Sequence, residues 1–121
     1  MTGNNKWRNL KRKPEDYKIA DTVLLAKVKL CNKFNVKLDD FEKKTTRRAN
    51  VIEARRFLIY FLKKQCNVRA LHIQWFVPSL THHATILHHL KKMDDFILNE
   101  KGKCDDYESF RYSVINGLLD N

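Results

Sequence analysis

The sequence contains few of the residues that interrupt helices or cross-link chains. Three glycines and two prolines among 121 residues are too few for a β-sandwich or barrel of many short strands, and no glycine-rich phosphate loop occurs. The three cysteines, Cys31, Cys66 and Cys104, are too few and too widely spaced for a disulfide framework or a structural zinc site. No apolar run approaches the roughly 20 residues that span a bilayer, and the polar N-terminus lacks a secretory signal. We therefore expect a cytoplasmic protein with no membrane segment.

Acidic residues are scarce in most of the chain. Lys and Arg number 24 and Asp and Glu 14, so the net charge is +10. Residues 1–93 hold 21 basic and 7 acidic residues, whereas residues 94–121 hold 3 and 7. A small chain with this excess of positive charge is typical of proteins that bind a polyanion, with nucleic acid the first candidate and a membrane surface the second. We expect the acidic C-terminal part to face away from that partner.

Apolar residues recur at helical spacing, which predicts an all-α fold of about six helices. A basic, flexible arm is expected over residues 1–13, and a single helical DNA-binding domain over 14–121 that ends in an acidic helix. Asn50 is a predicted N-cap, and Gly102 a predicted break before the last helix. The predicted helices span about 14–34, 38–44, 51–65, 69–76, 81 to Met93 or further, and 107–119.

The predicted helices at 69–76 and 81–93 are short and close together. Two such helices in a basic chain are typical of a helix-turn-helix unit. In the second helix Ile86, Leu90 and Met93 face the core at 100° per residue. The opposite side carries groups that suit phosphates and base edges in a major groove, although a merely solvated face would look the same. These groups are Thr81, Thr85, His88 and Lys92, with Ala84 and His89 at the flanks.

The histidines of this segment do not form a metal site. His83 and His88 point about 140° apart, and His82 and His89 lie about 10 Å apart along the axis. No catalytic motif occurs, and a Cys66–His72 nucleophile pair has no other support. We therefore expect no metal, no cofactor and no enzymatic activity.

The order of several segments resembles the C-terminal DNA-binding domain of the bacterial replication initiator DnaA. A helix ends in Lys33-Phe34-Asn35-Val36 and is followed by Leu38-Asp39-Asp40-Phe41, a basic loop with Arg47-Arg48, and a helix that begins Val51-Ile52-Glu53-Ala54-Arg55-Arg56. His83-Ala84-Thr85-Ile86-Leu87-His88 matches the H-x-T-[IV]-L-H phrase of that family, at the same interval from the long-helix arginine. The resemblance covers about residues 20–95.

The resemblance implies a Trp-repressor-like helix-turn-helix domain that binds duplex DNA as a monomer in replication or transcription control, nucleoid-associated when bound. It assigns Arg48, with Arg47 beside it, to the minor groove and the helix from 81 to the major groove. The chain departs from the family at His82, where an aspartate is usual, and at Ala84, where a threonine is usual. It also has no room for the initiator's AAA+ module. A different DNA target, in a phage or mobile-element setting, is therefore expected.

The residues predicted to contact DNA are Arg47, Arg48, Arg56, Thr81, His82, His83, Ala84, Thr85, His88 and Lys92. Arg55 is a further expected phosphate contact. The alternative is an adaptor for host replication or transcription proteins with only generic DNA affinity, which would dock through Trp75, Phe76 and Val77 if these were exposed. Structured RNA is a weaker third candidate, because no exposed aromatic sheet is predicted.

Overall fold

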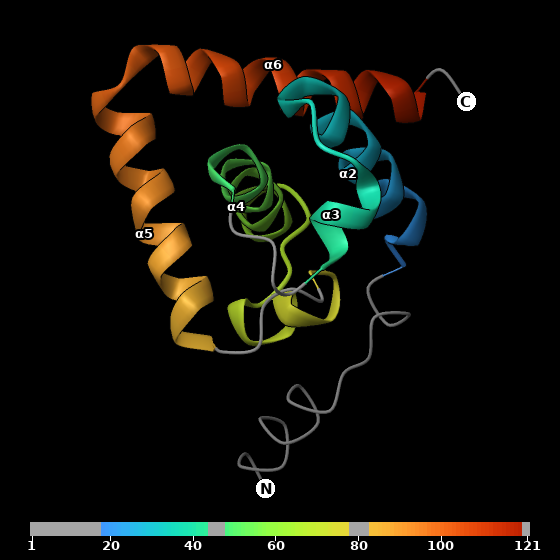
Figure 1. The fold of residues 1–121 in the computed structure, drawn as a ribbon, viewed down its shortest axis with the longest axis horizontal. Helices are drawn as coiled ribbons and strands as arrows, with labels where there is room; N and C mark the ends of the chain where they lie inside the picture. The colour runs from blue at the N-terminus through green and yellow to red at the C-terminus, as the bar shows by residue number, and fades with distance from the viewer. Residues whose placement is uncertain (1–17, 44–47, 78–82, 120–121) are drawn as a thin grey trace, which may run out of the picture.

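The computed structural model describes residues 18–43, 48–77 and 83–119, and all the regular structure in these ranges is helical (Figure 1). No strand occurs in them, so the predicted all-α fold class is confirmed. The predicted arm at residues 1–13 lies outside the described ranges. The elements are α2 (Ala20–Phe34), α3 (Leu38–Glu42), α4 (Ala49–Lys64), the 3₁₀ helix η2 (Ala70–Trp75), α5 (His83–Asn99) and α6 (Lys101–Leu119).

Helix α4 lies in the middle of the fold. Figure 1 shows it nearly end-on, with α2, α5, α6 and η2 around it. Its side chains are therefore buried on several sides, and the ring of Phe57 packs edge-on against Phe34 of α2 at a centroid distance of 5.0 Å. Phe61 packs against Phe110 of α6 at 5.3 Å. Such aromatic pairs make α4 the core that positions every other helix.

Arg55 is a charged residue in this core, with a relative exposure of 6%. Its Nε donates to the carbonyl oxygen of Phe41 at 3.0 Å, and its Nη2 donates to those of Asp40, at 3.1 Å, and Lys43. The last carbonyls of a helix have no partner within that helix, so the guanidinium supplies donors where α3 lacks them. Arg55 therefore joins α4 to the C-terminal end of α3.

The predicted break after α2 is confirmed, but the predicted cap of α4 is wrong. Asn35 adopts a left-handed conformation (φ 56°), and the Val36 N–H closes the helix end on the Cys31 carbonyl at 2.8 Å. Arg48, rather than Asn50, is the N-cap of α4. Asn50 lies inside the helix, where its Nδ2 donates to the Phe34 carbonyl at 3.1 Å. Its Nδ2 thus joins α4 to the end of α2, and its Oδ1 accepts from the Val51 N–H in the first turn of α4 at 3.0 Å.

Two other predicted boundaries are corrected. The helix predicted from about residue 14 does not include Lys18, which has φ 54°, and α2 begins at Ala20, while residues 14–17 lie outside the described ranges. Gly102 does not separate the last two helices, because α6 begins at Lys101 and the break is at Glu100. A glycine in the first turn of a helix, with open space around its α-carbon, interrupts little packing.

Replacing the buried Arg55 should destabilise the fold. Arg55→Met keeps an unbranched side chain of similar length but removes the donors to three carbonyls near the end of α3. The free energy of unfolding should fall by about 2–3 kcal/mol, the range for leaving buried polar groups unpaired. Urea denaturation monitored by circular dichroism measures it. The control Arg69→Met removes an exposed arginine and should change stability by less than about 0.5 kcal/mol. Equal losses in the two variants would contradict the role of Arg55.

Candidate nucleic-acid interface

The inner face of α5 packs as the sequence predicts. Ile86 and Met93 are fully buried, and Leu90 packs against the core while keeping partial exposure. Helix α5 contacts α4, η2 and α6. These contacts fix its orientation, so its outward side chains stand on a rigid support.

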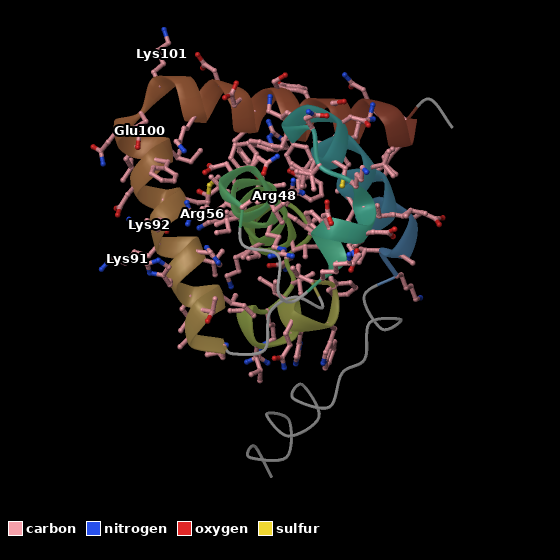
Figure 2. The ribbon with its side chains drawn as sticks, viewed as in Figure 1. Arg48, Arg56, Lys91, Lys92, Glu100 and Lys101 are labelled. Carbon is pink, nitrogen blue, oxygen red and sulfur yellow. The ribbon has the colours of Figure 1, made fainter. Side chains whose placement is uncertain are left out.

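The outward side of α5 carries six exposed residues that we call the outer strip. They lie on one face because they follow helical spacing of three and four residues. No acid occurs between His83 and Met93, and Asp94 and Asp95 follow directly. Figure 2 shows Lys91 projecting from the side of α5 that is turned away from α4. The outer strip consists of His83, Ala84, Leu87, His88, Lys91 and Lys92.

The outer strip differs from the predicted face. Thr85 is only partly exposed, and the predicted flank position of His89 is wrong because this side chain is half-buried against Arg56. Leu87, 47% exposed, and Lys91 are exposed but do not belong to the predicted face. Helix α5 packs against both α4 and η2. More of its circumference is therefore covered than in a helix with one neighbour, so the predicted solvent-exposed side is too wide. Leu87 could have been found from its place one turn beyond His83 and beside His88.

Arg56 lies between α4 and α5 and does not join the outer strip. Its Nε donates to Nδ1 of His89 at 3.1 Å, and its Nη1 lies 3.7 Å from a carboxylate oxygen of Glu53. The guanidinium also lies over the Phe96 ring, and the side chain is 13% exposed. Lys103 of α6 completes the group by donating to Glu53 at 3.1 Å. This network joins α4, α5 and α6, so the Arg56 guanidinium interacts mainly with groups of the protein itself.

His89 is held in its neutral form. Burial and the adjacent Arg56 guanidinium lower its pKa from 6.5 to about 4. Because arginine can only donate, Nδ1 must accept and the remaining ring proton must be on Nε2. His89 is therefore a structural acceptor, unlike the exposed His83 and His88 of the same helix.

Arg48 is exposed just before α4. Its Nη2 forms an ion pair with Oδ2 of Asp40 at 2.6 Å, and Lys43 Nζ lies 4.0 Å from the other Asp40 oxygen. Figure 2 shows Arg48 beside α4. The expected phosphate contact of Arg55 is wrong, because that side chain is buried and bonded to carbonyls. The predicted contacts Arg47, Thr81 and His82 lie outside the described residues.

Cys66 and His72 form the nucleophile pair that the sequence left without other support. Burial raises the pKa of the Cys66 thiol to about 11, and a protonated thiol is a poor nucleophile. His72 is buried and stacks on Trp75. Residues 18–43, 48–77 and 83–119 contain no group of three or more potential metal ligands, and none of their helices combines the length and apolarity needed to cross a bilayer.

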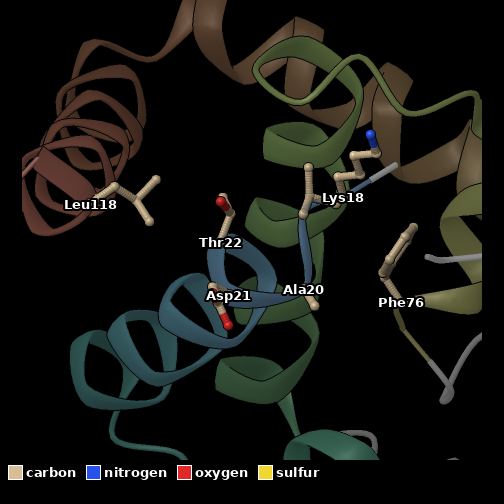
Figure 3. Close-up of a pocket in the computed structure, with 7 residues that line it drawn as sticks. Lys18, Ala20, Asp21, Thr22, Phe76 and Leu118 are labelled. Carbon is tan, nitrogen blue, oxygen red and sulfur yellow. The ribbon is translucent and has the colours of Figure 1, made fainter. Parts of the chain in front are cut away.

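A cavity of about 670 Å³ lies at the start of α2 (Figure 3). Phe76 and Leu118 line it together with the first turn of α2. Its charged groups are Lys18 and Asp21, which offer no paired carboxylates and no activated nucleophile.

The alternative adaptor function depends on exposure of Trp75, Phe76 and Val77. Phe76 and Val77 are buried, so little of this apolar patch is open to a partner protein.

Comparisons with known proteins identify no relative. No family model matches the chain, and neither the curated proteins nor the solved structures contain a match.

The pKa of His89 predicts how stability changes with pH. The unfolded chain binds a proton near pH 6.5, whereas folded His89 resists it down to about pH 4. Stability should therefore fall as pH drops through this window, by about 1–2 kcal/mol after allowance for partial exposure. Urea titrations at pH 7 and pH 4.5 measure the fall.

His89→Gln keeps a hydrogen-bond acceptor that does not titrate. Its free energy of unfolding should therefore fall less between pH 7 and pH 4.5 than that of the original chain. The control His83→Gln, at an exposed site on the same helix, should retain the full pH dependence of the original chain. An undiminished fall in the His89 variant would show that other groups cause it.

Proposed function

We propose that this protein binds duplex DNA in a sequence-dependent manner, with α5 as the helix that enters the major groove. The observation that carries the proposal is the outer strip of α5, an exposed face of imidazoles, lysines and small or apolar side chains without an acid. An α-helix fits the major groove of B-DNA, and the strip is long enough to meet several base pairs. The net charge of +10 supplies the attraction to phosphates.

The packing around α5 supports a helix-turn-helix arrangement. In such a unit, the first helix supports the second and crosses the DNA backbone. Helix η2 precedes α5 in sequence and packs against it, and both contact α4. The resemblance to the DNA-binding domain of the initiator DnaA leads to the same assignment of α5.

The chemistry of the outer strip favours sequence reading over generic attraction. His83 and His88 can donate to or accept from base edges, whereas Ala84 and Leu87 can contact thymine methyl groups. Lys91 and Lys92 lie further along the helix, where phosphates flank the groove. Asp95 would repel a backbone and limit how far the helix can extend into the groove, whereas the Asp94 carboxylate accepts from Tyr60 and lies 4.0 Å from Lys64 Nζ.

A DNA-binding domain of this kind would act by occupying its site. The proposed roles are control of transcription or control of an origin, with one monomer on one site. The resemblance gives the broad class, but Ala84 differs from the family threonine at one of the reading positions. We therefore propose a target that differs from the initiator's own.

Selection from random duplex DNA tests the proposal. We expect an enriched motif of roughly nine base pairs, bound at least a hundredfold more tightly than a scrambled duplex in anisotropy titrations, with a log–log salt slope of about −4 to −6. Arg48→Ala should weaken binding to all duplexes about three- to tenfold and reduce the salt slope by about 1.

Lys101→Ala is the matched control for this titration, because it removes one exposed cation at the corner between α5 and α6 (Figure 2). It should leave binding nearly unchanged. If no motif is enriched and the weak binding disappears with salt, the basic surface is generic and the proposal fails.

Leu87 provides a separate test of base reading. Leu87→Ala removes apolar contact from the middle of the outer strip and should reduce the preference for the selected duplex over its scramble about three- to tenfold. Leu98→Ala removes an exposed leucine of the same helix near its acidic end and should not change the preference. Comparable effects of the two substitutions would exclude the outer strip as the reading face.

A further inference from the structure

The ion pair between Arg48 and Asp40 connects the start of α4 to α3. Arg48 Nη2 lies 2.6 Å from Asp40 Oδ2. The Asp40 side chain is 24% exposed and that of Arg48 61%. The anionic partner is thus the better buried of the two, and the cation extends from it toward solvent.

Asp40 is held in place by the core below it. Its carbonyl oxygen accepts from the buried Arg55, and the next residue, Phe41, is fully buried. Its second carboxylate oxygen lies 4.0 Å from Lys43 Nζ. The carboxylate therefore has a fixed position, with one oxygen directed to Arg48.

The contact leaves most of the Arg48 guanidinium open. Arginine has five N–H donors in a planar fork, and among the described residues only Nη2 of Arg48 has a hydrogen-bond partner. The guanidinium can hold Asp40 and still present Nε and Nη1 to another acceptor. Ordering a long side chain before binding avoids an entropy cost that corresponds to roughly a two- to tenfold change in affinity.

We propose that Asp40 is a positioning residue for DNA binding, which acts by orienting Arg48 toward the phosphate backbone or groove edge. This inference rests on the proposed function, because it requires Arg48 to contact DNA. The carboxylate itself remains on the protein side of the guanidinium and does not touch the duplex. Without Asp40, Arg48 keeps its charge but loses its orientation.

A double-mutant cycle tests the inference. Anisotropy titrations on the selected duplex would compare the original chain with Asp40→Asn, Arg48→Ala and the double variant. Asp40→Asn should weaken binding about two- to tenfold when Arg48 is present. When Arg48 is absent, the same change should give no loss, because it only removes a negative charge that DNA repels.

The matched control is Asp39→Asn, which removes one charge from an exposed neighbour on the same short helix. It should leave affinity unchanged or raise it slightly. Asp40→Glu, which keeps the charge, should recover part of the affinity lost in Asp40→Asn. The urea denaturation curve of Asp40→Asn should match that of the original chain. This match would show that the weaker DNA binding of the variant is not caused by unfolding.

Three results would overturn the inference. Tighter binding of Asp40→Asn than of Asp39→Asn would mean that Asp40 competes with DNA for Arg48. An equal loss with and without Arg48 would mean that Asp40 acts elsewhere. Unchanged binding of Arg48→Ala to an enriched duplex would exclude Arg48 from the interface. All three leave DNA binding itself intact, whereas failure to enrich any duplex would refute the proposed function.

Discussion

The buried guanidinium of Arg55 constrains much of this fold. Arginine remains ionised in proteins, so a buried one must bring its hydrogen-bond partners with it. Here the partners are the carbonyls of Asp40, Phe41 and Lys43, at the end of a helix only five residues long. Arg48 precedes Arg55 by seven residues, close to two helical turns, and therefore reaches the same short helix from outside. The buried guanidinium of Arg55 thus holds α3 against α4, and the exposed one of Arg48 meets the same short helix from the solvent side.

Helix α5 separates its polar groups by direction. On the inner side the imidazole of His89 accepts from Arg56, and Glu53 and Lys103 extend the contact to α6. On the outer side, His83 and His88 are exposed. Histidines of the same helix thus have a structural role on one face and are open to solvent on the other. The packing of α5 against two elements decides which histidines are buried, because it determines how much of the helix circumference is covered.

The sequence was sufficient to predict the helical class, the end of α2 at Asn35 and the buried positions Ile86 and Met93. These features follow from periodicity and from local backbone preference, which are written in neighbouring residues. It could not distinguish Arg55 from Arg56. Both follow Ala54 and carry the same charge, and only the position of carbonyls 12–15 residues earlier in the chain makes one of them the buried residue.

The same limit applies to the candidate site. Leu87 is exposed although it is apolar, and its exposure depends on how α5 meets both α4 and η2. The predicted break at Gly102 is wrong, because the effect of a glycine depends on its place in the helix. Where a residue's role is set by a distant partner, a one-dimensional pattern contains no signal for it.

The change from cations to acids along α5 has a kinetic consequence. Lys91 and Lys92 are followed at once by Asp94 and Asp95, and Glu100 lies at the corner with α6 (Figure 2). In the field of the proposed DNA partner, a molecule with this charge asymmetry would experience a torque and rotate while it is still diffusing. A larger fraction of encounters would then begin in a productive orientation, which would increase the rate of association more than the lifetime of the complex.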